Sequence, residues 1–146
     1  MSDKVTRQLE ALIRLRVSQQ NVLREQLVTL KKQKEFKVEE IQKVEADMAS
    51  NLESQHQMKI DFYANIKVKI FDYDDVYTLD IDLEKMDRQY DDLVKVKHCH
   101  IDELMELEKQ IKTTEGELKT LVIEEEKYKY LMQDADFGIQ HGTNKH

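Results

Sequence analysis

The chain has 146 residues, no Pro or Trp, three Gly, 36% charged residues and a net charge of −7. This composition is typical of long helices and coiled coils, because helix breakers are rare and Lys, Glu and Leu are abundant. A single cysteine excludes an internal disulfide, and no run approaches the roughly 20 apolar residues of a membrane span. We therefore expect a protein of the reducing cytoplasm.

The first predicted element is a helix from about residue 3 to about residue 70. A heptad pattern that starts at Thr6 and Leu9 runs through this segment, and ten of its eighteen a and d positions are apolar. We call these positions the seam, because they would face a partner helix. Lys34 and Lys37 interrupt the seam, and we expect both to extend their charges outward along their own stems.

A turn is predicted at residues 71–78, where Asp72, Asp74 and Asp75 cluster. Alternation of apolar residues on both sides of this segment leaves a short β-hairpin as an alternative. The alternating residues are Ile66, Val68 and Ile70 before the turn, and Tyr77, Leu79 and Ile81 after it.

The second predicted helix covers residues 79–136 and carries the clearer heptad pattern. Its seam starts at Leu83 and Met86, and twelve of sixteen positions are apolar or aromatic. Thr78 can cap the start of this helix, and Phe137-Gly138 offers a stop. Residues 137–146 are polar and are expected to be disordered.

Together these elements predict an all-α fold, with residues 1–136 forming one antiparallel coiled-coil hairpin of two long helices. If the turn centres near Asp74, residue i lies opposite roughly residue 149 − i. Arg24 would then face the carboxylates of residues 124–126, while Arg7, Arg14 and Arg16 would lie opposite the end of the second helix or beyond it.

The charge is unevenly distributed along the chain. Residues 1–34 hold eight Lys and Arg against three Asp and Glu, whereas the rest of the chain is acidic. Pairing between the helices could explain Arg24, Lys31 and Lys32. It explains Arg7, Arg14 and Arg16 less well, and we expect these three to bind a partner.

Apolar residues outside the seam also indicate a partner. Tyr63, Ile66, Ile70 and Tyr73 share one face if the helix continues through them, and such a stripe suggests docking. Weak homo-oligomerisation into a four-helix bundle would cover the same residues.

No cofactor, metal site or enzymatic activity is expected. His98 and His100 flank Cys99, but residues two apart on a helix diverge by about 200° and cannot share one ion. The acidic segment that starts at Asp80 resembles the opening of a calcium loop but lacks the required glycine. Nucleic-acid binding is not favoured, because the acidic second helix would cancel the field of the basic segment.

The residues assemble into a familiar pattern. "ALIRLRVSQQNVLREQL" opens a helix of about seventy residues, an acidic break follows, "TLDIDLEKMDRQYDDLVKVK" starts a second heptad helix, and "EEEKYKYLMQDAD" closes it. Over roughly residues 5–136 this resembles the YscO/FliJ family of type III secretion and flagellar export, and is closer to the YscO branch of virulence secretion. The family consists of small cytoplasmic coiled-coil hairpins.

The resemblance implies a non-enzymatic stalk component, located in the cytoplasm and peripheral to the inner-membrane secretion apparatus. Its open end would sit in the hexamer of the secretion ATPase and promote its assembly, and other parts would reach the export gate protein or bind secretion chaperones. From their charge, Arg7, Arg14, Arg16 and Arg24 are candidates for the ATPase contact. From their exposure on one predicted face, Tyr63, Ile66, Ile70 and Tyr73 are candidates for the gate or chaperone contact. A prefoldin-like holdase chaperone and a generic coiled-coil scaffold remain as alternatives.

Overall fold

The computed structural model describes residues 2–66 and 72–144, and describes the side chains of residues 3–66 and 72–134. It contains two helices, α1 (Ser2–Ile66) and α2 (Tyr73–Asn144), and the described residues form no strand. The predicted all-α hairpin of two long helices is confirmed. Over the residues described, neither helix contains a stretch long and apolar enough to cross a membrane.

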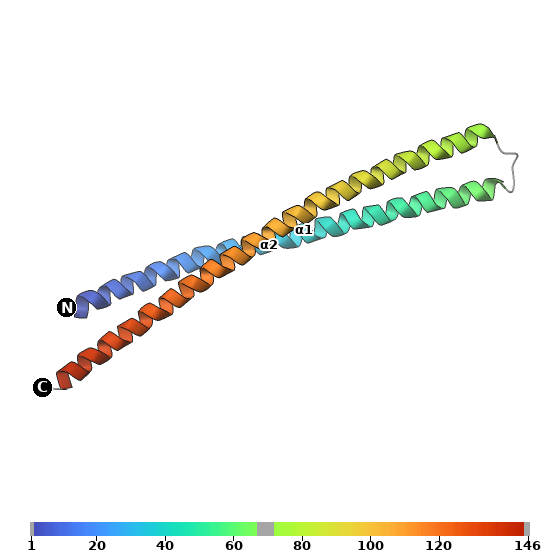
Figure 1. The fold of residues 1–146 in the computed structure, drawn as a ribbon. Helices are drawn as coiled ribbons and strands as arrows, with labels where there is room; N and C mark the ends of the chain where they lie inside the picture. Colours follow the sequence, from blue (N-terminus) through green and yellow to red (C-terminus); the bar gives the residue numbers. More distant parts are fainter. Residues whose placement is uncertain (1, 67–71, 145–146) are drawn as a thin grey trace. The chain divides into compact units, whose positions relative to one another are not determined.

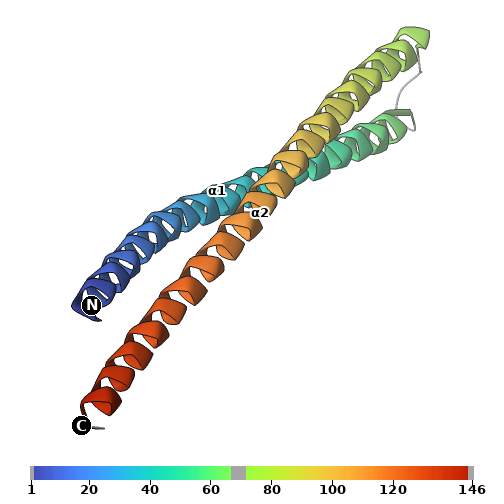
Figure 2. The same ribbon diagram turned by 60° about the vertical axis from the view of Figure 1, so that its left-hand side comes forward.

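The chain divides into two compact units, each of which pairs a segment of α1 with a segment of α2. Unit 1 comprises residues 1–33 and 107–146, and unit 2 comprises residues 34–106. Within each unit the two segments lie side by side (Figures 1 and 2). They run antiparallel, because contacts from later residues of α1 reach earlier residues of α2.

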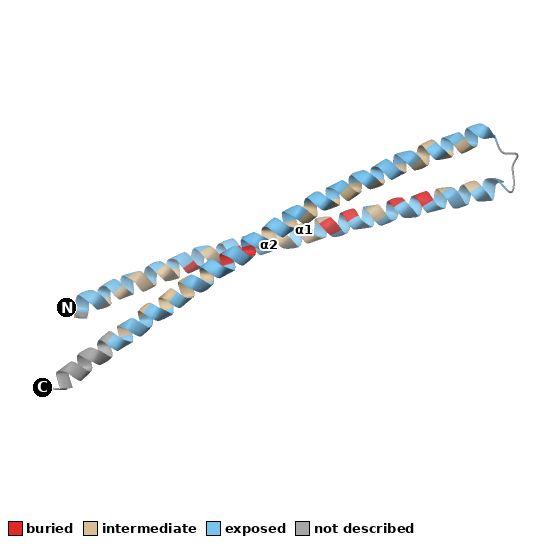
Figure 3. Ribbon diagram, viewed as in Figure 1, coloured by how far each residue is buried: buried red, intermediate tan, exposed pale blue. Residues whose placement is uncertain are grey.

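Burial follows the predicted seam closely. Every a and d residue from Thr6 to Phe62 and from Leu83 to Met132 is buried or half-buried, and Asn65 is the one described exception. Figure 3 shows the few buried residues along both helices. Leu27 and Ile111 are the buried apolar residues of unit 1, and Ile41 and Val44 are those of unit 2. Burying each such side chain contributes about 1.5–3 kcal/mol, so one narrow stripe holds each pair of segments together.

The predicted turn at residues 71–78 is wrong for residues 73–78, which form the first turns of α2. The backbone N–H of Asp75 donates to the carbonyl of Asp72 at 3.1 Å, and Asp74 and Asp75 occupy the first turn, where the helix dipole favours carboxylates. Val76 and Leu79 extend the heptad and are half-buried. The earlier start therefore adds buried apolar surface to unit 2.

Three further expectations about this region change with the start of α2. Thr78 does not cap the helix, because its hydroxyl donates to the carbonyl of Asp74 from within it. The β-hairpin alternative is wrong for Tyr77, Leu79 and Ile81, which are helical. The described part of α1 ends at Ile66 rather than at residue 70, and the predictions for residues 67–71 lie outside the described residues.

The disordered tail predicted for residues 137–146 is also wrong as far as Asn144, because α2 continues to that residue. A stop at Gly138 would place glycine in the left-handed conformation that ends many helices. No glycine within the described residues has a positive φ angle. Residues 145 and 146 lie outside the described residues.

The pairing register differs from the prediction by about one heptad, roughly seven residues. Gln20 contacts Leu121 and Glu125 in unit 1, whereas the predicted register placed it near residue 129. In unit 2 Lys97 pairs with Glu45, which was expected opposite residue 104. The cause is the earlier start of α2, at Tyr73 rather than near residue 79, which brings earlier residues of α2 opposite any given residue of α1.

Candidate protein-interaction site

The four N-terminal arginines divide into two pairs in unit 1. Arg7 and Arg14 are exposed, and within the described residues neither forms an ion pair. Arg16 is half-buried, and Arg24 donates hydrogen bonds to its own helix. The structure therefore leaves two of the four candidate arginines free to bind another molecule.

Arg16 binds α2 rather than projecting beyond it. Its Nε lies 2.5 Å from Oε2 of Glu124, its guanidinium carbon lies 5.9 Å from the centre of the Tyr128 ring, and it donates to Gln19. Contact with Tyr128, and then with Glu124, raises the pKa of Arg16 against the opposing effect of partial burial. The expectation that Arg16 has no partner on α2 is wrong, because the one-heptad shift in register brings Glu124 opposite it.

Arg24 belongs to a polar network at the seam of unit 1. It donates to the side-chain oxygens of Asn21 and Gln20, each at 3.2 Å. Gln20, only 2% exposed, donates to Glu125 at 2.9 Å and to the carbonyl of Leu121 at 3.3 Å. The hydrogen bond from Gln20 has the largest effect on the pKa of Glu125 and lowers it. The hydrogen bond from Lys129 and the charge of Arg24 lower this pKa further. Arg24 thus lies near the acidic run as predicted, but it acts through Gln20.

Arg14 lines a groove between the two helices of unit 1. The groove has a volume of about 540 Å³, and Ile13 and Met132 form its apolar part. Glu10, Arg14, Lys129 and Gln133 form its polar part. A partner side chain with a carboxylate and an apolar stem would satisfy both parts, since arginine pairs with carboxylates through two parallel hydrogen bonds.

The predicted apolar stripe does not occupy one helical face. Tyr63 and Ile66 lie at the end of α1 and are 65% and 39% exposed, whereas Tyr73 begins α2 and is 83% exposed. Ile70 lies outside the described residues. The three described members are exposed apolar residues of unit 2 on two different helices, and Tyr77 joins them at 62% exposure.

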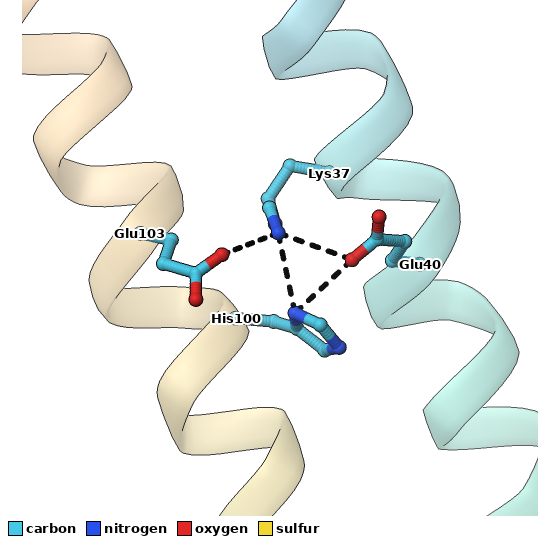
Figure 4. A network of polar contacts seen from close by, with 4 residues as sticks. All are labelled: Lys37, Glu40, His100 and Glu103. Atoms are coloured by element: carbon cyan, nitrogen blue, oxygen red, sulfur yellow. Dashed lines mark hydrogen bonds and ion pairs between the residues drawn. The ribbon is translucent and has the colours of Figure 1, made fainter.

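A second polar network joins the helices of unit 2 (Figure 4). Lys37 of α1 bonds with Glu40 at 3.1 Å, and it also bonds with Glu103 of α2. His100 Nδ1 lies 3.2 Å from Oε2 of Glu40 and 3.4 Å from Nζ of Lys37. The expectation that Lys37 extends its charge outward is wrong, because its side chain is only 14% exposed and three groups surround its ammonium.

The contacts of this cluster favour the charged forms of Lys37 and Glu103. The hydrogen bond to Glu103, and then the one to Glu40, raises the pKa of Lys37. The hydrogen bond from Lys37 lowers the pKa of Glu103. His100 Nδ1 can either accept from Lys37 or donate to Glu40, because one nitrogen cannot do both. The cluster joins Lys37 and Glu40 of α1 to His100 and Glu103 of α2, and these four side chains meet only in the observed register of the two helices.

The neighbouring histidine and cysteine point elsewhere. His98 and Cys99 are exposed, while His100 is half-buried at the seam, so the two imidazoles diverge as the helical spacing predicts. Among the residues described, no three His, Cys, Asp or Glu side chains are grouped so as to hold a metal ion.

The sequence pattern does not reveal the residues that complete both networks. Gln20, Tyr128 and Glu103 belong to no motif, and only the correct register would have placed them beside their partners.

Comparison of the chain with protein-family models, with curated proteins and with solved structures gives no match.

Proposed function

We propose that this chain is a non-catalytic stalk component of a type III secretion system, of the kind found in the YscO/FliJ family. Unit 1 binds the hexameric secretion ATPase and promotes its assembly. Unit 2 contacts the export gate protein or a secretion chaperone. The protein acts in the cytoplasm, at the periphery of the inner-membrane secretion apparatus.

The exposure of Arg7 and Arg14 is the observation that supports this proposal most. They lie one heptad apart on the same side of α1, and Arg14 lines the groove of Ile13 and Met132. An exposed arginine can bind a carboxylate of a partner protein through two parallel hydrogen bonds, which fixes the geometry of the contact. Arg16 and Arg24 have a different role. Arg16 pairs with Glu124 of α2, and Arg24 donates to Gln20, which bonds to α2 in its turn.

The exposed aromatic residues of unit 2 support a second contact. Tyr63, Tyr73 and Tyr77 are each more than 60% exposed. Tyrosine is enriched at protein interfaces, because its ring buries apolar area and its hydroxyl keeps a hydrogen bond. These residues lie in the unit that does not carry the arginine surface, so the two contacts need not compete.

The prefoldin-like alternative depended on a β-hairpin across residues 66–81. Its second strand does not form, since residues 73–81 are helical. A generic coiled-coil scaffold explains the helices equally well. It gives no reason for two exposed arginines on one side of a helix in an acidic chain, one of which lines an apolar groove.

The test is binding to the secretion ATPase of the same organism, measured by co-purification and by stimulation of ATP hydrolysis. We expect Arg7→Glu/Arg14→Glu to abolish both effects, because two attractive contacts become repulsive. Arg88→Glu/Lys95→Glu is the matched control, since it reverses two exposed cations of unit 2. Circular dichroism would verify that all proteins keep their helices.

Lack of binding by the unmodified chain would refute the stalk proposal. Equal loss in both double variants would assign the effect to net charge and remove Arg7 and Arg14 as the contact. Loss of gate or chaperone binding in Tyr63→Ser/Tyr77→Ser, with ATPase binding kept, is expected for the second surface.

A further inference from the structure

A second groove lies between the helices of unit 2, with a volume of about 530 Å³. Met86, Leu93 and Val96 of α2 provide its apolar floor, and Val96 is 43% exposed. Asp47 of α1 and Asp92 of α2 flank this floor from opposite sides. Both carboxylates are exposed, and within the described residues neither forms an ion pair.

Further carboxylates follow the same side of both helices. Asp61 lies two heptads after Asp47, and Glu106 lies two heptads after Asp92, so each pair occupies one side of its helix. We call this side of unit 2, with its groove, the acidic face. An occupant that carries cations around a small apolar centre would complement it, because charge complementarity selects partners and their orientation.

This chain itself contains such a surface. The α1 segment of unit 1 is the chain's one strongly basic segment, and Arg7 and Arg14 lie on the side that bears the groove of Ile13 and Met132. Lys112, Lys119 and Lys129 of α2 lie on the same side of unit 1 by their heptad positions. We call this the basic face. Each face thus has an apolar groove, and the charges around the two grooves have opposite signs.

We propose that the basic face of unit 1 in one copy docks on the acidic face of unit 2 in a second copy. The balance of charge supports a second copy as the occupant. Unit 1 holds thirteen Lys and Arg against eleven Asp and Glu, while unit 2 holds ten against nineteen. Like-with-like pairing of two acidic units would be repulsive, whereas pairing of unit 1 with unit 2 brings opposite charges together.

The interaction rests in part on the proposed function, because it uses the arginines assigned to the ATPase. A second copy and the ATPase would then compete for Arg7 and Arg14. The acidic face has no part in ATPase binding, so substitutions there separate the two proposals.

The test is sedimentation equilibrium of the full chain at about 0.05 M and about 0.5 M NaCl, between which the Debye length falls from roughly 14 to roughly 4 Å. At low salt we expect the average mass to rise above the single-chain value of 17.4 kDa as concentration increases. At high salt it should stay at that value. Asp47→Lys/Asp92→Lys should remain monomeric at low salt and should still bind and stimulate the ATPase.

Glu53→Lys/Asp102→Lys is the matched control, because it changes the net charge equally at exposed positions outside the acidic face. It should associate like the unmodified chain. A mixture of the Arg7→Glu/Arg14→Glu chain with the Asp47→Lys/Asp92→Lys chain should associate again, because both faces are reversed together. A monomeric unmodified chain at low salt, or equal loss in the control, would overturn the proposal.

Discussion

Units 1 and 2 follow the same heptad rule but present opposite surfaces. In both, the described a and d side chains are buried or half-buried whether they are apolar or polar, with Asn65 of unit 2 as the one exception. Unit 1 carries exposed arginines outside the seam, while unit 2 as a whole holds nine more acidic than basic residues. The difference teaches that the repeat determines how the helices pair, and that the residues outside it determine which molecules each unit can attract.

The seams of the two units also differ in their polar members. Unit 1 buries Gln20, which bonds across the helices to Glu125. Unit 2 buries Asn51 and Gln55, where Asn51 donates to the carbonyl of Met86 at 3.1 Å and Gln55 donates to Asn51 at 2.7 Å. Such side chains reduce stability relative to leucine but specify the register.

The largest expected effects come from the apolar seam. Leu27→Ala in unit 1 and Ile41→Ala in unit 2 should each lower the free energy of unfolding by about 2–3 kcal/mol, measured by urea denaturation. Both side chains are under 10% exposed. Hydrogen exchange should show the greatest loss of protection in the unit that carries the substitution.

Leu15→Ala is the matched control for these substitutions, because Leu15 is 49% exposed outside the seam. It should change stability by less than about 0.5 kcal/mol. An equal rise in hydrogen exchange in both units after Leu27→Ala would show that the two units unfold together. Their stabilities could then not be compared separately.

The next effect concerns register. Gln20→Leu/Asn51→Leu should keep or raise the melting temperature while allowing pairing one heptad away, the register predicted from the sequence. Cysteines replacing Lys31 and Glu115, whose charges lie 3.8 Å apart, report the observed register in a Cys99→Ser background. Disulfide formation should be slower and less complete in the leucine variant. Unchanged crosslinking would show that apolar packing alone determines the register.

A smaller effect depends on pH. Hydrogen bonds from Gln20 and Lys37 lower the pKa of Glu125 in unit 1 and of Glu103 in unit 2, below the ordinary value of 4.5. A carboxyl group with a lowered pKa stabilises the fold above its ordinary pKa, and this contribution disappears as the pH falls through the lowered value. Stability should therefore decline below pH 4.5, and less steeply in Glu103→Gln or Glu125→Gln. Parallel curves for the variants and the unmodified chain would contradict these pairings.

Both helices could be predicted from the sequence because the heptad repeat continues for many turns. The side chains that the repeat places at a and d are also the ones that pack between the helices. The location of the turn was harder to predict, since aspartates favour turns and helix starts for the same reason, their hydrogen bonds to nearby backbone. This one ambiguity moved the register by a heptad. It hid the partner of Arg16, one of the four arginines expected to bind another protein.

The smallest expected effect on stability comes from Lys31, and it is best compared with that of Lys37. Each of these lysines of α1 pairs with a glutamate of α2. Lys31 pairs with Glu115 at 3.8 Å with both side chains more than half exposed, so Lys31→Ala should change stability by less than about 0.5 kcal/mol. Lys37→Ala should cost clearly more, because it leaves Glu40 and Glu103 facing each other without a cation. Thermal unfolding at low and high salt distinguishes them, since salt should remove the effect of Lys31 and spare most of that of Lys37. Equal effects would mean that the cluster of unit 2 acts as an ordinary surface ion pair.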